Sequence, residues 1–208
     1  MKIPARIPLW IKWMYPSFTW QMPSTEKALY LTFDDGPHPT ITPVVLNLLA
    51  DFNAKATFFC IGDRAKRYPD IMKRIVAEGH SIGNHTQHHV NGWKSSVSVY
   101  TEEIHQASRL IASKLFRPPY GRIKRKQAKV LENEGYKIIM WTILSADYDH
   151  SLNKEECASR VTSHIDKGNI YLFHDSDKGG VRMLHALPIL LKLATAKGFL
   201  FKRIEDVG

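Results

Sequence analysis

Residues 28–37, Ala-Leu-Tyr-Leu-Thr-Phe-Asp-Asp-Gly-Pro, combine a strand-like apolar run with a polar end. The first six residues are typical of a buried strand, which stops at two adjacent carboxylates and a turn. Residues 169–173 have the same character and stop at His174. In proteins of alternating strands and helices, reactive groups gather at the carboxyl ends of strands. We therefore expect Asp34, Asp35 and His174 to lie at one end of a parallel sheet.

Alternating strand and helix patterns continue along the chain. Strands are predicted at 28–33, 54–60, 80–84, 136–144, 169–173 and 199–204, with a short extended piece before Arg117, and helices at 40–51, 68–78, 96–114, 123–134, 153–166 and 183–197. This alternation favours an α/β fold with a parallel sheet, and about seven strand signals favour a closed or nearly closed barrel. We expect one catalytic domain, residues 28–208, preceded by a lead-in segment, residues 1–27.

The composition is that of an ordinary globular protein, with 44% hydrophobic and 24% charged residues. No stretch approaches the ~20 apolar residues of a membrane-spanning helix, and the N-terminus lacks the features of a secretory signal. We therefore expect a protein that is cytoplasmic or peripheral to the membrane. Aromatic and basic residues at 9–15 would suit an interfacial anchor. However, Pro4, Pro8 and Pro16 favour a lead-in that packs its aromatics over one end of the domain.

The net charge of +9 and the two cysteines restrict the possible partners. Several cations crowd the start of one predicted helix: Arg122, Lys124, Arg125, Lys126 and Lys129. A solvated face, an anionic polymer or an anionic membrane surface would each account for them. No recognition motif accompanies them, so nucleic-acid binding is not expected. Cys60 and Cys157 are predicted to be free, buried thiols.

The adjacent carboxylates Asp34 and Asp35 suggest a metal. Successive side chains of a strand point to opposite faces, so the chain must bend at Gly36 and Pro37 if both carboxylates serve one site. Neighbouring carboxylates repel unless a positive charge separates their roles. A divalent metal bound by one of them would leave the other free as a base. The alternative is a simple turn that caps the following helix.

His85 and His89 lie four residues apart, which predicts two imidazoles on one face of a helical turn. Two histidines and one carboxylate leave positions open for water and substrate, as in catalytic zinc sites, and also suit non-haem iron(II) or another first-row ion. Taken singly, the histidine pair could be chance, and His174, Arg117 and Asp147 would be ordinary core, turn and loop residues. Their common position at strand ends, in one order, favours a shared site.

That order resembles the polysaccharide deacetylases of carbohydrate esterase family 4, which include the nodulation-type chitooligosaccharide deacetylases. The resemblance covers residues 28–204 and rests on Thr-Phe-Asp-Asp-Gly-Pro at 32–37, His-Thr-Gln-His-His at 85–89, Arg-Pro-Pro-Tyr-Gly at 117–121 and Leu-Phe-His at 172–174. The family's Asp-x-x-Asp-Trp motif is altered, because Leu144 replaces its first Asp and Tyr148 its Trp, while Asp147 is kept. The resemblance implies a distorted (β/α)7 barrel, and the altered motif suggests an atypical or narrowed substrate.

The resemblance implies a metal-dependent hydrolase that removes N-acetyl groups from peptidoglycan-like or chitin-like glycans and releases acetate. It implies that Asp35, His85 and His89 hold the metal, with Zn²⁺ expected and Co²⁺, Ni²⁺ or Fe²⁺ as alternatives. Two other functions remain open. One is hydrolysis of a small cyclic imide or ureide on the same scaffold, and the other is non-catalytic carbohydrate binding with a decayed site.

The resemblance also implies roles for five further residues. Asp34 is expected to be the general base, with Arg117 as its ion-pair partner. The backbone N–H of Tyr120 is expected to stabilise the oxyanion. His174 is expected to protonate the departing amine, and Asp147 to orient it and raise its pKa.

Overall fold

The strand that carries the paired carboxylates lies at the centre of the fold. In the computed structural model, which describes residues 4–23 and 25–205, β1 (Ala28–Asp34) is buried at every position. It pairs in parallel with β2 (Ala56–Cys60) on one side and with β7 (Ile170–His174) on the other. These strands are continuous apolar runs because both faces of a parallel sheet are covered.

The sheet curls into a nearly closed barrel. In the described part of the chain its strands follow the order β5-β4-β3-β2-β1-β7-β6, and β8 pairs with β1. The remaining strands are β3 (Ser81–Asn84), β4 (Leu115–Phe116), β5 (Lys137–Ile138), β6 (Ile143–Leu144) and β8 (Leu200–Phe201). The break falls between β5 and β6, which are joined only by residues 139–142. This architecture confirms the predicted α/β fold and its distorted (β/α)7 barrel.

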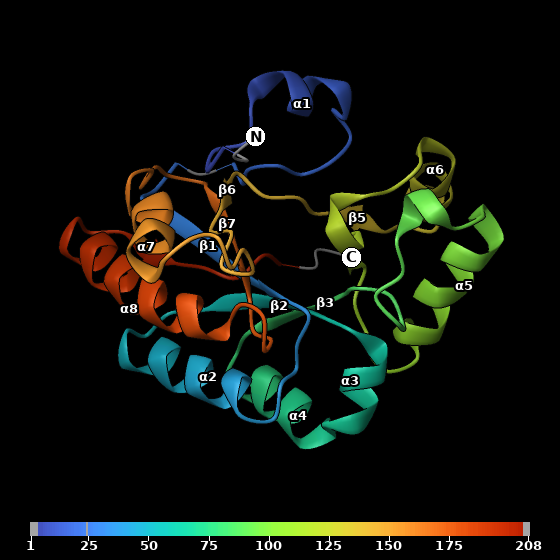
Figure 1. The fold of residues 1–208 in the computed structure, drawn as a ribbon. Helices are drawn as coiled ribbons and strands as arrows, with labels where there is room; N and C mark the ends of the chain where they lie inside the picture. Colours follow the sequence, from blue (N-terminus) through green and yellow to red (C-terminus); the bar gives the residue numbers. More distant parts are fainter. Residues whose placement is uncertain (1–3, 24, 206–208) are drawn as a thin grey trace.

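Helices surround the sheet, as Figure 1 shows. They are α2 (Ile41–Asp51), α3 (Gly62–Arg67), α4 (Pro69–Ala77), α5 (Val97–Ser108), α6 (Arg125–Asn133), α7 (Lys154–Thr162) and α8 (Gly180–Ala196). Two short 3₁₀ turns, η1 (Gly92–Lys94) and η2 (Pro119–Gly121), lie in the loops after β3 and β4. Among the described residues, no helix has the length and apolar character needed to cross a membrane.

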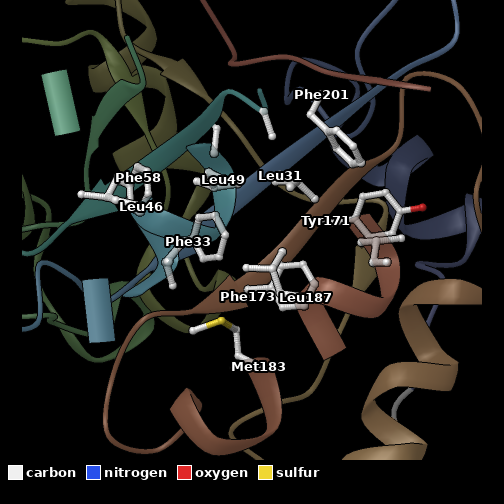
Figure 2. Close-up of a cluster of buried hydrophobic side chains, with 14 of the residues drawn as sticks. Leu31, Phe33, Leu46, Leu49, Phe58, Tyr171, Phe173, Met183, Leu187 and Phe201 are labelled. Atoms are coloured by element: carbon white, nitrogen blue, oxygen red, sulfur yellow. The ribbon is translucent and has the colours of Figure 1, made fainter. Parts of the chain in front are cut away.

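An apolar core anchors the central strands (Figure 2). Phe33 of β1 stacks on Phe58 of β2 and on Phe173 of β7, with ring centroids 5.0 and 5.8 Å apart. Leucines of α2 and α8, including Leu46 and Leu187, complete this core and are fully buried. Both cysteines are free and buried, as predicted. The packing fixes the strands whose carboxyl ends carry the candidate site.

The prediction of one strand over residues 136–144 is wrong. Only its two ends pair as β5 and β6, because residues 139–142 cross the break in the sheet. The N-terminal segment fills this break instead. Thr19 donates its N–H to Ile138 O (2.9 Å), and its own carbonyl accepts from the Met140 N–H (2.8 Å). Further along, the Ile7 N–H donates to Thr142 O (2.9 Å). Because Thr19 and Ile7 lie far from residues 136–144 in the sequence, the local pattern of residues 136–144 gives no sign of this pairing.

The lead-in segment packs only part of its aromatics. Phe18 and Trp20 are buried against the barrel, whereas Trp10 and Trp13 of the short helix α1 (Leu9–Met14) are exposed. Figure 1 shows α1 set apart from the barrel body. Residues 1–3 and 24 of the predicted lead-in, and residues 206–208 of the predicted catalytic domain, lie outside the described residues.

Trp20→Ala should destabilise the fold by about 3–5 kcal/mol, because it empties a buried site beside the sheet break. The Trp20 indole N–H also donates to Tyr15 O (3.1 Å), so the truncation removes a hydrogen bond. Trp13→Ala is the matched control, since Trp13 is 76% exposed and its loss should cost no more than about 0.5 kcal/mol. Urea unfolding measures both values. If Trp20→Ala lowered the free energy of unfolding as little as Trp13→Ala, the packing of Trp20 would not help to close the sheet.

Candidate active site

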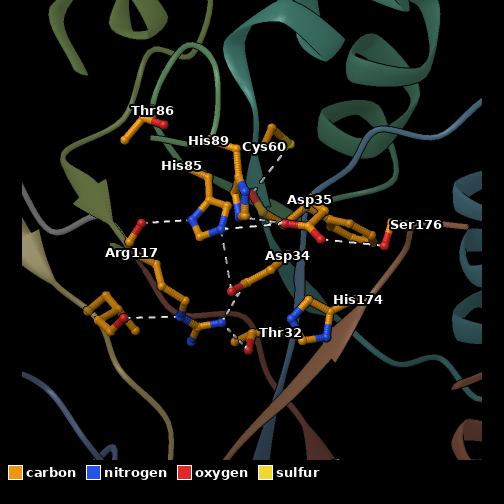
Figure 3. Close-up of polar contacts among 12 residues, drawn as sticks. Thr32, Asp34, Asp35, Cys60, His85, Thr86, His89, Arg117, His174 and Ser176 are labelled. Carbon is orange, nitrogen blue, oxygen red and sulfur yellow. Dashed lines mark hydrogen bonds and ion pairs between the residues drawn. The ribbon is translucent and has the colours of Figure 1, made fainter. Parts of the chain in front are cut away.

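Both predicted carboxylates face one cluster because the chain turns immediately after β1. Asp35 has a φ of 75°, in the left-handed region that is costly for a residue other than glycine. The bend therefore begins one residue before the expected Gly36. As a result, Asp34 Oδ2 and Asp35 Oδ1 lie 3.8 and 3.7 Å from the same atom, Nε2 of His85. Figure 3 shows these side chains together.

His85 and His89 belong to a loop after β3, and the predicted helical turn is wrong. Thr86 and His89 have φ values of 65° and 57°, which no helical turn contains. The left-handed residues still bring both rings together, with centroids 5.1 Å apart. His85 Nδ1 lies 2.7 Å from Arg117 O. Since a carbonyl only accepts, Nδ1 carries the proton, and Nε2 presents its lone pair to the carboxylates.

Asp35, His85 and His89 fit a divalent metal. Each offers one ligand atom, and these atoms lie within 4.8 Å of one another. Asp35 Oδ1 is buried, lies 3.1 Å from His89 Nε2 and accepts no hydrogen bond from any described residue. An oxygen left in this state is stabilised by a cation. Three such donors leave positions open for water and substrate, as in catalytic zinc sites.

The protonation states in this cluster also suit metal ligation. Burial lowers the pKa of His85 to about 4, so the ring is neutral at physiological pH. Burial alone would raise the pKa of Asp35, but contact with His89 and the charges of the surrounding histidines hold it below its ordinary value. His88 is exposed and contacts Glu103 at 2.9 Å, so it points away from the cluster.

Arg117 is fully buried and pairs with Asp34. One guanidinium nitrogen, Nη1, donates to both Asp34 Oδ1 and Thr32 Oγ1 at 2.7 Å (Figure 3). The other two nitrogens donate as well, Nε to Ile139 O (3.0 Å) and Nη2 to Met140 O (2.8 Å). A buried charge persists only when it is paired and hydrogen-bonded. The geometry leaves Asp34 Oδ2 as the oxygen that faces the histidines.

His174 and Asp147 form a second buried pair. Asp147 Oδ1 lies 2.7 Å from His174 Nδ1, and its Oδ2 accepts the His174 backbone N–H at 2.8 Å. Burial favours the neutral ring, but the Asp147 carboxylate outweighs it, and the pKa of His174 rises to about 9. The ring of Tyr148 packs edge-on against the imidazole, with centroids 5.1 Å apart. Protonated Nδ1 leaves Nε2 as the nitrogen that can exchange a proton.

Tyr120 presents a backbone donor beside the cluster. Its φ of 60° turns the chain at η2, and its N–H donates to no other described residue. Its ring lies against that of His89, with centroids 4.6 Å apart. The structure therefore brings every predicted site residue to the carboxyl ends of the strands.

Two residues that contribute to this arrangement were not predicted. Asp175 is buried, and its Oδ2 accepts from Thr42 Oγ1 at 2.5 Å. A Cβ on Gly36 would lie 2.2 Å from the same oxygen, so Asp175 fills the space that the missing side chain leaves. Thr32 Oγ1 donates to Tyr171 O (2.6 Å) while it accepts from Arg117. In the sequence, Asp175 stands out only as an acid after His174, and Thr32 only as a polar residue inside an apolar strand.

The barrel and its cluster of acid, base and metal-type ligands define the chain as a hydrolase of the α/β-barrel class. Residues 21–139 match the family model described as Polysaccharide deacetylase. The chain belongs to the polysaccharide deacetylase family.

Individual relatives support this assignment. A peptidoglycan-N-acetylglucosamine deacetylase of Bacillus cereus is 34% identical over 195 residues, which cover 91% of this chain and 92% of the relative. A chitooligosaccharide deacetylase of Azorhizobium caulinodans is 31% identical, with 84% and 91% covered. The crystal structure of the Bc1960 peptidoglycan N-acetylglucosamine deacetylase in complex with 4-naphthalen-1-yl-N-oxidanyl-benzamide superposes with a TM-score of 0.86, at 30% identity and 95% coverage of both chains.

Asp147→Asn should lower the pKa of His174 from about 9 toward ~6.5, because the main charge that opposes burial is lost and only the smaller effects of Asp35 and Asp34 remain. Titration of the His174 ring by NMR, in the presence of a chelator, measures the change. Glu134→Gln, which alters the His105–Glu134 pair on the surface, is the control and should leave His174 unchanged.

The same pair should affect stability with a defined sign. A raised folded-state pKa stabilises the fold fully below pH ~6.5, and this contribution is lost as the pH rises through about 9. The stability difference between the wild type and Asp147→Asn should therefore shrink over that interval. An unchanged His174 titration in the variant would contradict the assignment.

Proposed function

We propose that this protein is a metal-dependent deacetylase that hydrolyses the N-acetyl group of amino sugars in a peptidoglycan-like or chitin-like glycan. The observation that carries the proposal is the convergence of three metal-type ligands with an Arg-paired carboxylate and a carboxylate-paired histidine. The relatives act on such glycans according to their names. The products would be acetate and a free amino sugar.

Asp35, His85 and His89 would hold the metal, and we propose Zn²⁺ because their nitrogen and carboxylate donors match catalytic zinc sites. A bound divalent ion would supply Lewis acidity and lower the pKa of a coordinated water toward ~7. The bond from His85 Nδ1 to Arg117 O fixes the orientation of one ligand ring.

Asp34 is the proposed general base. Its Oδ1 accepts from the Arg117 guanidinium at 2.7 Å, which fixes the orientation of the carboxylate. Its Oδ2 is turned toward the ligand cluster and can take the proton of an attacking water. The buried Arg117 also restrains the carboxylate from rotating away, since each of its three nitrogens is already held by a hydrogen bond.

Two groups complete the proposed reaction. The free N–H of Tyr120 can donate to the oxygen of the acetamide carbonyl as negative charge develops on it. His174, with its pKa raised to about 9, is protonated near neutral pH and can give the Nε2 proton to the departing amine. Asp147 holds the ring in the orientation that leaves Nε2 free for this transfer.

Asp34→Asn should lower kcat by at least about 10²–10⁴-fold, the usual contribution of a positioned general base, while metal binding survives. Asparagine keeps an oxygen that can accept from Arg117, which favours a folded variant. Asp35→Asn is the contrasting change and should weaken metal binding as well. Metal content by mass spectrometry and acetate release measure the two effects. Loss of the metal from Asp34→Asn would refute this division of roles.

Acetate release from N-acetylglucosamine oligomers and from peptidoglycan should stop after chelation and return when Zn²⁺ is added back. This follows because the three ligand residues are expected to hold the ion that the reaction requires. Enzymatic acetate detection on the purified protein measures the release. Activity that persists after complete metal removal would argue against the proposed metal dependence. Absence of release from every acetylated glycan, with metal bound, would argue for a small-molecule amide substrate or carbohydrate binding alone.

A further inference from the structure

An exposed tryptophan lies on the face that carries the candidate active site. Trp93 belongs to η1, in the loop after β3 that also contains His85 and His89, and is 56% exposed. Tyr120 belongs to the loop after β4 and is 61% exposed. Exposed apolar side chains that lie close together and are rimmed by polar residues mark a binding site, because leaving them in water forgoes the free energy of burial.

Trp93 is held in one orientation without being buried. Its indole Nε1 donates to Ile123 O (3.3 Å), and its backbone N–H donates to the side chain of Asn91 (3.0 Å). The guanidinium of Arg122 lies over the indole ring, 5.1 Å from its centroid. A Cβ on Gly92 would approach Arg122 O to 2.5 Å, so the two loops are pressed together here. The aromatic surface is therefore fixed in advance, which lowers the entropic cost of binding.

Trp93 is linked to the metal-type ligands through the loop that carries both Tyr120 and Arg122. The ring of His89 lies against the ring of Tyr120. Tyr120 is followed by Gly121, whose φ of 65° turns the chain, and then by Arg122, which covers Trp93. The loop at 120–122 therefore reaches from the His89 ring to Trp93, and a chain of sugars whose acetamide lies at the His89 cluster would follow this loop. Pyranose rings present faces of C–H groups that pack well on such amphipathic aromatic surfaces.

The surroundings of Trp93 carry positive charge. The exposed cations are Lys94, Arg122, Lys124, Arg125 and Lys126. Among the described residues none of these forms an ion pair with a carboxylate. Such an unbalanced field attracts anionic ligands and repels cationic ones. A neutral chitin-like chain gains nothing from these charges, whereas a glycan that bears carboxylates does.

We propose that Trp93 and Arg122 form an accessory subsite for a sugar unit that carries a carboxylate, either on the sugar or on an attached peptide. The indole packs on the pyranose face, and the edge of the Arg122 guanidinium donates to the carboxylate. This inference rests on the proposed deacetylase function and deepens it, since it assigns the substrate to the anionic, peptidoglycan-like class.

Three substrates of matched length separate the possibilities: neutral N-acetylchitotetraose, glycan strands with lactyl carboxylates but no peptide, and strands with peptides attached. Arg122→Gln should lower kcat/KM about tenfold on a carboxylate-bearing glycan and less than about twofold on the chitotetraose. The anionic substrate on which Arg122→Gln lowers kcat/KM identifies the source of the carboxylate, either the sugar itself or the attached peptide. Trp93→Ala should lower kcat/KM on all three, mainly by raising KM. Lys192→Gln removes one exposed charge from α8 and should change none of them.

Binding measured by calorimetry in an Asp34→Asn background tests the subsite independently of turnover. Arg122→Gln should weaken the binding of anionic strands about tenfold in this background as well. An equal effect of Arg122→Gln on neutral and anionic glycans, or no effect on either, would overturn the proposal. Absence of turnover in the wild type, with Arg122-dependent binding of anionic strands retained, would refute the deacetylase function but not the subsite.

Discussion

The buried guanidinium of Arg117 is the constraint on which the rest of the site depends. A charge removed from water must find partners for all its donors, and the sheet break supplies two of them. The carbonyls of Ile139 and Met140 turn toward the barrel interior, where they accept from Arg117. A third nitrogen, Nη1, donates to Thr32 and Asp34 of β1. The distortion of the barrel and the position of the base are thus two aspects of one hydrogen-bond network.

Backbone strain is concentrated around the same network. Asp35, Thr86, His89, Tyr120 and Ala146 all adopt left-handed conformations without being glycine. Such positions cost of order 1–3 kcal/mol each and persist where surrounding contacts hold them. Each is a residue with a proposed role or the neighbour of one, and each lies in a loop that follows the carboxyl end of a strand. The buried hydrogen bonds and the packing of the central strands therefore hold the loops in a geometry that the free chain would avoid.

These features also explain what the sequence could predict. β1, β2 and β7 are long apolar runs, so their ends, and hence Asp34 and His174, could be placed from local pattern alone. The division of residues 136–144 could not, because the bonds of Thr19 and Ile7 come from far along the chain. The histidine loop was misjudged for another reason, since spacing suggests a helix but left-handed backbone leaves no signature in residues such as Thr86. Asp175 was missed because a single acid in a loop carries little information.

The two replaced residues of the family motif, Leu144 and Tyr148, change the surroundings of the proposed acid and not the acid itself. Leu144 is buried in an apolar cluster with Leu152 and Leu172, so its side chain contributes packing beside the site and no charge. Tyr148 still covers the edge of the His174 ring, and the bond from His174 to Asp147 is intact. The substitutions therefore leave the proposed acid unchanged and alter only its surroundings. Specificity then depends on the exposed loop surfaces, while the chemistry depends on buried groups whose partners permit little variation.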